Sequence, residues 1–211
     1  MATAGHPLFA RCYAWLSHRM ERELGQHRRR QLAGLRGKVI EIGAGNGMNF
    51  AHYPTGVADV LAVEPEPHLR RLAQRQAEHA AVPVEVVAGV ADRLPAADAS
   101  LDAAVTTLVL CSVPDQATAL AEIRRALRPG GQLRFFEHVR AEAAGLRRAQ
   151  RVLDATIWPV IAGGCHTHRD TAAAIREAGF TITHLQALHF PDLRFSTPTS
   201  PHILGTALRP R

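Results

Sequence analysis

Three glycines at alternate positions, Gly43, Gly45 and Gly47, interrupt an apolar run within the stretch KVIEIGAGNGMNF. Glycine has no Cβ, so a turn built from it lets a ligand approach the main chain closely, at a cost in conformational entropy. A dinucleotide-binding turn needs the spacing GxGxxG. The spacing here is GxGxG, with Met48 where the last dinucleotide glycine belongs, which argues against a nicotinamide or flavin cofactor.

A carboxylate follows these glycines at a distance that nucleotide-binding folds use. Glu64 ends the next apolar run, 21 positions after Gly43. In doubly wound sheets, ligands lie beyond the carboxyl ends of the strands, where such an acid hydrogen-bonds ribose hydroxyls. The combination of strand, GxGxG and strand-terminal acid therefore predicts a ribose-containing ligand. The alternative is a tight turn followed by an exposed glutamate.

One histidine is placed to act as a base. His138 follows Glu137 at the end of a later apolar run, and an imidazole exchanges its proton near neutral pH. If that run is a strand, its carboxyl end lies on the ligand side of the sheet. We therefore take His138 as the leading catalytic candidate. The alternative is a histidine satisfied inside the core or bonded to Glu137.

The segment GGCHTHRD concentrates further reactive side chains, and Cys165 and His166 join the catalytic candidates. One interpretation is a substrate-side lid hinged at Gly163 and Gly164. Another is a metal site. However, the spacing is not a standard zinc pattern, and Cys111 is the only obvious distant thiol to complete it, so we expect no metal. A helix end followed by the cap of the next helix is a further alternative.

Two helical positions carry the remaining candidates. Asp154 and Trp158 are spaced i and i+4, which puts them on one face of a predicted helix. They would line an acceptor pocket with one polar and one aromatic group, or they would form a contact between helices. Asp154 is included among the catalytic candidates. Tyr13 and Trp15 belong to a predicted amphipathic helix and would close over a cofactor or pack in the core.

The composition is that of a soluble globular protein. Of 211 residues, 46% are hydrophobic and 21% are charged, with a formal net charge of +6, which excludes a disordered chain. The basic run HRRRQ lacks interleaved aromatic residues, so we expect a solvated helix face and no nucleic-acid partner. Three scattered cysteines favour a reducing, cytoplasmic location. No secretory signal or transmembrane segment is expected; peripheral membrane contact and the oligomeric state are left open.

Strands alternate with helices over most of the chain. Strands are expected at residues 38–42, 57–64, 82–89, 101–113 (running into a loop), 132–139, 180–188 and 202–208. Helices are expected at about 7–33, from 46, at 65–80, from a cap at Asp115 to 127, at about 142–160, and up to 178. This alternation implies an α/β, doubly wound parallel sheet. The last two strands have no helix between them and should form an antiparallel edge pair.

Five segments together resemble the class I S-adenosylmethionine-dependent methyltransferases: VIEIGAGNG, VEPEP, TLVLCSVPD, LRPGG and FFEHV. The pair Asp154 and Trp158, GGC followed by Arg169, and the closing PHILGTA are similar to the methyltransferase-like group that includes the alkyl-thiol methyltransferases. The similarity covers about residues 38–209. It implies a Rossmann-like, seven-stranded, mostly parallel sheet with an antiparallel last strand. We expect a helical cap at residues 1–36 and the methyltransferase domain at residues 37–211.

The resemblance also implies S-adenosyl-L-methionine as the cofactor and a small molecule as the acceptor. Glu41 and the glycine turn would face the methionine part, and Glu64 would hold the ribose. The cofactor-binding residues assigned in this way are Glu41, Gly43, Ala44, Gly45, Gly47, Glu64, Pro65, Ala91 and Leu108. A thiol acceptor is favoured over an amine, hydroxyl or activated carbon of a lipid, quinone or secondary metabolite. Modification of a nucleic acid, and cofactor binding without catalysis, are the competing classes.

Overall fold

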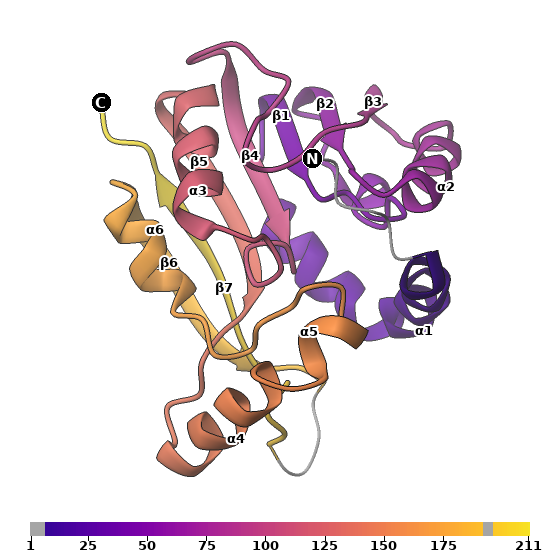
Figure 1. Ribbon diagram of the computed structural model, residues 1–211. Helices are drawn as coiled ribbons and strands as arrows, with labels where there is room; N and C mark the ends of the chain where they lie inside the picture. The colour runs from indigo at the N-terminus through magenta and orange to yellow at the C-terminus, as the bar shows by residue number, and fades with distance from the viewer. Residues whose placement is uncertain (1–6, 192–195) are drawn as a thin grey trace.

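Seven strands form one sheet in the computed structural model, which describes residues 7–191 and 196–211 (Figure 1). The spatial order is β3-β2-β1-β4-β5-β7-β6. The strands are β1 (Gly37–Ile42), β2 (Val57–Val63), β3 (Val84–Val87), β4 (Leu101–Thr107), β5 (Leu127–His138), β6 (Thr181–His189) and β7 (Pro201–Leu208). Neighbours from β3 to β5 are parallel, and β7 is antiparallel to both β5 and β6. The predicted seven-stranded, mostly parallel sheet is confirmed.

Helices cover both faces of this sheet. They are α1 (Pro7–Leu32), the short 3-10 helix η1 (Phe50–His52), α2 (Pro67–Ala77), α3 (Gln116–Ala126), α4 (Ala144–Asp154), α5 (Trp158–Ile161) and α6 (Thr171–Glu177). The expected cap at Asp115 is confirmed, because its carboxylate accepts from the Ala117 amide at 2.9 Å. Residues 1–6, the start of the expected N-terminal cap, lie outside the described residues.

The strand residues divide between two hydrophobic layers. Along β1, Val39 packs with α1 and α2 on one face, while Ile40 packs with α3 and α6 on the other, and both are fully buried. Successive side chains of a strand point to opposite faces of the sheet, so a strand covered on both sides places neighbouring residues in different layers. Figure 1 shows the same arrangement, with α1 and α2 on one side of the sheet and α3 and α6 on the other. The doubly wound expectation is therefore confirmed.

Two predicted helices differ from the structure. No α-helix starts at Asn46, where the chain instead makes turns that lead into η1. Gly47 has a φ of +82°, which a right-handed helix cannot contain. The predicted helix over 142–160 is broken after Asp154. A continuous helix would lack one backbone hydrogen bond at Pro159, and that proline instead stands in the first turn of α5.

The last two strands form the expected antiparallel pair at the edge of the sheet beyond β5, but not in chain order. Instead β7 lies between β5 and β6, with Glu137 opposite Ile203 and His138 opposite His202. This insertion brings the start of β7 beside the carboxyl end of β5. It therefore contributes a second histidine to the neighbourhood of His138.

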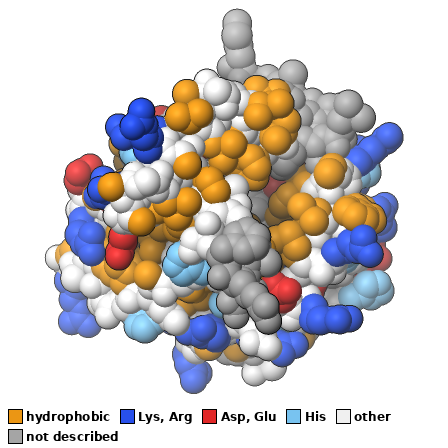
Figure 2. Space-filling view, turned by 90° about the horizontal axis from the view of Figure 1, so that it is seen from below, with side chains coloured by type: hydrophobic (Ala, Val, Ile, Leu, Met, Phe, Trp, Pro, Cys, Tyr) orange, Lys and Arg blue, Asp and Glu red, His pale blue; other side chains and the backbone are white. Residues whose placement is uncertain are grey.

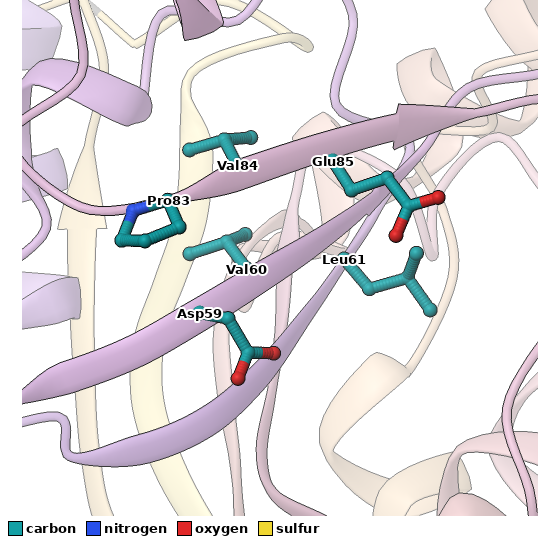
Figure 3. Close-up of a pocket in the computed structure, with 6 residues that line it drawn as sticks. All are labelled: Asp59, Val60, Leu61, Pro83, Val84 and Glu85. Atoms are coloured by element: carbon teal, nitrogen blue, oxygen red, sulfur yellow. The ribbon is translucent and has the colours of Figure 1, made fainter.

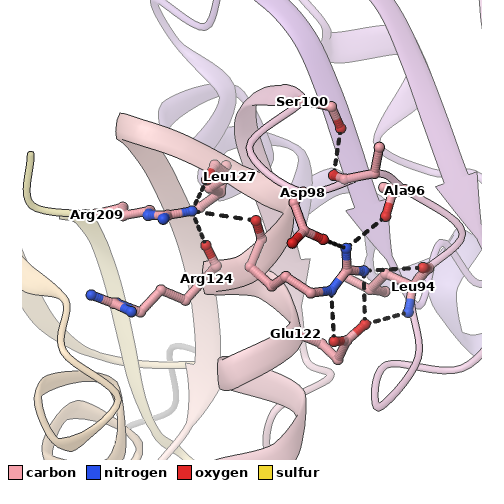
Figure 4. Close-up of polar contacts among 10 residues, drawn as sticks. Leu94, Ala96, Asp98, Ser100, Glu122, Arg124, Leu127 and Arg209 are labelled. Atoms are coloured by element: carbon pink, nitrogen blue, oxygen red, sulfur yellow. Dashed lines mark hydrogen bonds and ion pairs between the residues drawn. The ribbon is translucent and has the colours of Figure 1, made fainter.

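An arginine network fixes the opposite end of the sheet, where β4 and β5 begin (Figure 4). Arg125 donates to Glu122 and Asp98, and also to the carbonyl oxygen of Ala96. Arg209 donates to the carbonyl oxygens of Arg124 and Leu127 at the end of α3. These contacts join the chain before β4 and the end of β7 to α3, so they stabilise the frame far from the glycine turn.

Candidate functional site

The glycine turn lies at the carboxyl end of β1, as expected. Gly43, Gly45 and Gly47 have φ values of +65°, +58° and +82°, a region that only glycine enters without strain. The amides of Gly43 and Ala44 donate to the Val63 carbonyl oxygen at 2.8 and 3.1 Å. These bonds hold the turn against the end of β2.

Close packing adds a second reason for the glycines. A Cβ placed on Gly43 would lie 2.6 Å from a methyl carbon of Val109, in the loop after β4. A Cβ on Gly45 would lie 3.3 Å from the Tyr13 ring. The turn is therefore enclosed by β4's loop on one side and by α1 on the other.

Glu64 lies directly beside this turn, immediately after β2, and is 5% exposed. One carboxylate oxygen accepts from the Gly45 amide at 2.8 Å and the other from the Glu66 amide at 2.9 Å. Burial raises its pKa, although both amide donors favour the ionised form. Each carboxylate oxygen has two lone pairs, so Glu64 can still accept from two ligand hydroxyls.

Glu41 is a second buried acid, inside β1 and 2% exposed. Its two oxygens accept from the Tyr53 hydroxyl at 2.7 Å and from the Asn49 amide at 2.8 Å. Burial raises the pKa of Glu41 to about 7. Arg28, on α1, donates to the Asn49 side chain at 2.7 Å. Sequence reasoning missed Asn49, Tyr53 and Arg28; the only signal was two polar residues close behind the glycines.

The helix α1 covers the glycine turn. The Asn46 side chain donates to the Ser17 hydroxyl at 2.8 Å, and both residues are buried. Tyr13 lies against Gly45, and burial raises the pKa of its hydroxyl. Residues Ala10 and Ala14 pack on Leu69 of α2, so the helix rests on both the turn and α2.

The loop after β4 carries Leu108 and Cys111 past the same end of the sheet. Leu108 has a φ of +60°, unusual for a residue other than glycine, and its amide donates to the Phe136 carbonyl oxygen at 2.8 Å. The fully buried Glu137 accepts from the amides of Val109 and Cys111 at 3.2 and 3.3 Å. Burial raises the pKa of Glu137. These two hydrogen bonds to Glu137 therefore fix the backbone of the loop after β4.

His138 adjoins two cysteines. Its Nδ1 lies 3.3 Å from the Cys165 sulfur, and its Nε2 lies 2.5 Å from the Thr199 carbonyl oxygen. Both ring nitrogens thus have partners other than Glu137, because successive residues of a strand point to opposite faces. The alternative of a bond between His138 and Glu137 was wrong. Cys111 completes the group, and the ligating atoms of all three residues lie within 4.8 Å of one another.

The charges in this group depend on one another. A hydrogen bond between the two thiols raises the pKa of Cys111 well above its ordinary value and lowers the pKa of Cys165. For His138, burial lowers the pKa, but contact with Cys111 outweighs that effect and the net direction is upward. The arrangement can therefore hold or exchange a proton between sulfur and imidazole.

An aromatic stack holds the His138 ring in place. The ring of His202 on β7 lies 4.1 Å from that of His138, centroid to centroid, and 5.1 Å from that of Phe136 on its other side. Burial, followed by the nearby His138, holds the pKa of His202 well below its usual range. Sequence reasoning missed this residue, because only the insertion of β7 beside β5 brings it near.

Asp154 supports the segment that contains Cys165. Its carboxylate accepts from the Thr167 and His168 amides at 2.8 and 2.9 Å and from the Thr167 hydroxyl at 2.9 Å. His166 lies 3.9 Å from the same carboxylate, and its amide donates to the Cys111 carbonyl oxygen at 2.8 Å. These contacts connect the segment to the loop after β4; the catalytic roles of Asp154 and His166 stay predictions.

The remaining assigned positions follow β2 and β3 in the chain. Pro65 is exposed, and its carbonyl oxygen accepts from Arg70 at 3.1 Å. Ala91 is half-buried against the core, in the turns after β3. Asp170 caps α6 by accepting from the Ala173 amide at 3.0 Å, as the cap interpretation of GGCHTHRD expected.

A hollow of about 300 Å³ lies elsewhere, on β2 and β3 near Asp59 and Glu85 (Figure 3). It opens before the strands reach their carboxyl ends, so it is separate from the glycine turn. In the view from below, hydrophobic side chains are exposed over a wide area (Figure 2). In and between α4 and α5, which lie at that end, the exposed large hydrophobic residues are Val152, Ile157, Val160 and Ile161. None of the helices within the described ranges has the length and apolar character to span a bilayer.

Comparison with known proteins agrees with this geometry. The family described as Methyltransferase domain matches residues 40–135, from β1 to β5. The Thiol S-methyltransferase TMT1B of Homo sapiens is 40% identical over 185 residues, which cover 84% of this chain and 74% of that protein. Human Thiol S-methyltransferase TMT1A is 38% identical, covering 85% and 74% respectively. The Malonyl-[acyl-carrier protein] O-methyltransferase of Methylococcus capsulatus is 33% identical, and the match covers 80% of this chain and 62% of that protein.

Solved structures share the fold at lower identity. An S-adenosylmethionine dependent methyltransferase from Mesorhizobium loti aligns with a TM-score of 0.65 at 22% identity, covering 88% of this chain and 97% of that one. A geranyl diphosphate methyltransferase aligns with a TM-score of 0.70 at 16% identity, covering 91% and 79%. With the two human relatives matched over most of both chains, the chain belongs to the class I S-adenosylmethionine-dependent methyltransferase family, in the group that includes the thiol S-methyltransferases.

Proposed function

We propose that this methyltransferase transfers the methyl group of S-adenosyl-L-methionine to the thiol of a small, apolar molecule. The observation that carries the cofactor half is the bond from the Gly45 amide to the Glu64 carboxylate. This bond supports the assignment of Glu64 as the ribose-binding acid, because it holds the carboxylate against a glycine turn at the carboxyl ends of the strands. When bound, the cofactor supplies an electrophilic methyl group on a sulfonium.

The protein's part is to position and to exclude water. Glu64 would accept from the two ribose hydroxyls, and the turn from Gly43 to Gly47, with Ala44 in it, would face the methionine part. Pro65, the backbone at Ala91 and the Leu108 carbonyl would border the adenosine. The helix α1 would act as the proposed cap, since Tyr13 already lies over Gly45. Orientation of this kind supplies a large share of the rate in a displacement reaction.

The residues near His138 and α5 favour a thiol of low polarity as the methyl acceptor. Cys165 and His138 lie at the carboxyl ends of the strands, on the side where an acceptor must approach. The neighbouring α5 exposes Val160 and Ile161, and Ile157 is exposed just before it; all three would contact an apolar substrate. We further propose that the Nδ1 of His138 would take up the thiol proton, so that the acceptor would present a thiolate to the electrophilic methyl group that the bound cofactor would supply. Both human relatives are named thiol S-methyltransferases.

An acceptor panel tests the proposal directly. The purified protein is incubated with isotopically labelled S-adenosyl-L-methionine and matched alkyl thiols, alcohols, amines and phenols, and methylated products are identified by mass spectrometry. We expect label in thioethers. Methylation confined to the oxygen or nitrogen compounds would remove the thiol assignment. The O-methyltransferase relative from Methylococcus capsulatus makes the oxygen acceptors the most informative competitors. A cytoplasmic location stays a prediction from the cysteine pattern.

Calorimetry with S-adenosylhomocysteine tests the cofactor half separately. Binding in wild type and its loss in Gly45→Val, whose side chain would fill the turn, is the expected result. Retained binding in the variant would take this turn out of the site. Binding without methylation of any acceptor would favour a cofactor-binding protein without catalysis.

A further inference from the structure

Two sulfurs and one imidazole nitrogen converge at the end of β5, from three separate parts of the chain. Cys111 comes from the loop after β4, His138 ends β5, and Cys165 lies between α5 and α6. We propose that these three residues bind one thiophilic divalent cation of the zinc class and leave its fourth position open. The proposal departs from the expectation, drawn from sequence spacing, that the chain holds no metal.

The distances fit such a cation. Tetrahedral zinc with sulfur and nitrogen ligands places the ligand atoms roughly 3.5–3.8 Å from one another. Here Nδ1 of His138 lies 3.3 Å from the Cys165 sulfur, and all three ligating atoms lie within 4.8 Å of one another. Rotations of the side chains that move the ligating atoms by up to about 1 Å would bring all three to a common centre. Both cysteines are buried, at 1% and 5% exposure, whereas His138 is half-buried, so the two sulfurs are shielded while the group keeps contact with solvent.

The hydrogen bonding of His138 points its lone pair at the sulfurs. Nε2 faces the carbonyl oxygen of Thr199 at 2.5 Å, and a carbonyl only accepts, so Nε2 carries the hydrogen. In the neutral ring Nδ1 is then the unprotonated nitrogen, directed at Cys165. A histidine that donates its second ring hydrogen to a backbone carbonyl is the usual arrangement around a metal ligand. This is an observation independent of the clustering itself.

Each ligand is held in position before any cation binds. The Cys111 amide donates to Glu137 at 3.3 Å, and its carbonyl accepts from the His166 amide at 2.8 Å. The Cys165 amide donates to the Ala162 carbonyl at 3.1 Å. The stack on His202 fixes the His138 ring. Preorganisation of this kind lowers the entropic cost of assembling a site from remote segments.

The local charge also suits a dication. Two thiolates and a neutral imidazole neutralise a charge of +2, and the buried carboxyl group of Glu137 lies beneath the loop. Arg169 is the neighbouring cation. Its guanidinium is engaged by the carbonyl oxygens of Leu110 and Val113 at 2.8 and 2.7 Å, which keeps it pointed at the loop backbone.

The open position gives the site a role that rests on the proposed function. An acceptor thiol binding there would lose its proton to solvent, because coordination strongly favours the thiolate. The coordinated sulfur would then form the new bond to the methyl carbon as the carbon–sulfonium bond breaks, and the neutral thioether would leave as a weak ligand. His138 would serve as a ligand, and this role excludes its role as proton acceptor. Metal content decides between the two.

Cobalt substitution tests the site without relying on activity. The full chain, reduced by a phosphine, is titrated with Co²⁺ and followed by thiolate-to-cobalt charge-transfer absorption, with Zn²⁺ as competitor. We expect one Co²⁺ per chain, displaced by Zn²⁺. Cys111→Ser, Cys165→Ser and His138→Gln should each weaken binding at least tenfold. Cys12→Ser, which alters the exposed cysteine, is the matched control and should bind as wild type.

The outcomes separate this inference from the proposed function. Absence of the charge-transfer band in folded wild type, or equal binding by all three variants, would overturn the cation site. A Cys111–Cys165 disulfide in the protein as isolated under nitrogen would also overturn it. A shift of the cobalt bands on addition of a short alkyl thiol would support the open position. Loss of S-adenosylhomocysteine binding, measured separately, would instead count against the cofactor half alone.

Discussion

Two buried polar clusters lie at the carboxyl ends of the strands, and they differ in how their atoms are used. In the acid cluster, Glu41 and Glu64, each of the four carboxylate oxygens accepts a hydrogen bond from the protein. In the sulfur cluster, Cys111, His138 and Cys165, the sulfurs have only soft contacts, such as 3.3 Å from Cys165 to His138. The hydrogen bonds of the acid cluster hold its side chains in place, whereas the sulfurs of the second cluster have electron pairs left to bind a ligand.

The difference follows from the partners available to each cluster. The acids accept from the amides of Gly45 and Glu66 and from the side chains of Asn49 and Tyr53, all within one stretch of the chain from residue 41 to residue 66. The two cysteines come from two separate loops and meet His138 at the end of β5, and sulfur is a weak hydrogen-bond acceptor. A carboxylate buried without donors would be severely destabilising, while a buried thiol is tolerated as a small apolar group.

Titration of Glu41 gives the largest expected effect. Its pKa rises from 4.5 to about 7 in the folded chain, chiefly through burial. Folding therefore favours the protonated form, and this stability is fully present below about pH 4.5 and lost as the pH rises through about 7. The loss amounts to about 3 kcal/mol. Urea unfolding at a series of pH values should show that Glu41→Gln removes this part of the pH dependence. Parallel curves for the two proteins would mean that the donors hold Glu41 ionised.

Replacement of Glu64 tests whether the acid cluster binds the cofactor. Glu64→Ala should weaken S-adenosylhomocysteine binding by about 1–3 kcal/mol, because two hydroxyls would lose a buried acceptor. Glu85→Ala, which removes an exposed acid from the adjacent strand, is the control and should leave the dissociation constant unchanged. Calorimetry on the three proteins measures both. Equal dissociation constants throughout would place the ribose elsewhere.

The contrast between the clusters also explains what sequence reasoning reached. The glycine turn and Glu64 fall within one strand–turn–strand unit, so their proximity followed from spacing, and the order of strands and helices gave the sheet. The sulfur cluster joins residues 27 or more positions apart, and His202 joins it only because β7 inserts beside β5. No local pattern encodes such a meeting. The break before α5 was missed because amphipathic spacing continued through Pro159.

The tie between α1 and the glycine turn has a smaller expected effect. Ser17→Ala would leave the buried Asn46 amide without its acceptor and should lower the free energy of unfolding by about 1 kcal/mol. Ser100→Ala, in which an exposed hydroxyl loses its bond to Ala97, is a matched control with a change of a few tenths of a kcal/mol at most. Denaturant unfolding compares the two. A larger loss in the control would show that α1 is not anchored through Ser17.

The smallest effect is expected at the far end of the sheet, where the Arg125 network uses charges that reach solvent. The Asp98 side chain is 79% exposed, so screening by water limits its ion pair with Arg125. Arg125→Lys should lower the free energy of unfolding by less than about 1 kcal/mol and leave S-adenosylhomocysteine binding unchanged, since the groups that Arg125 contacts lie in α3 and in the chain before β4. The same unfolding and calorimetric measurements apply. A change in cofactor affinity would show that a substitution at the start of β4 and β5 alters the positions of Glu41 and Glu64 at the other end of the sheet.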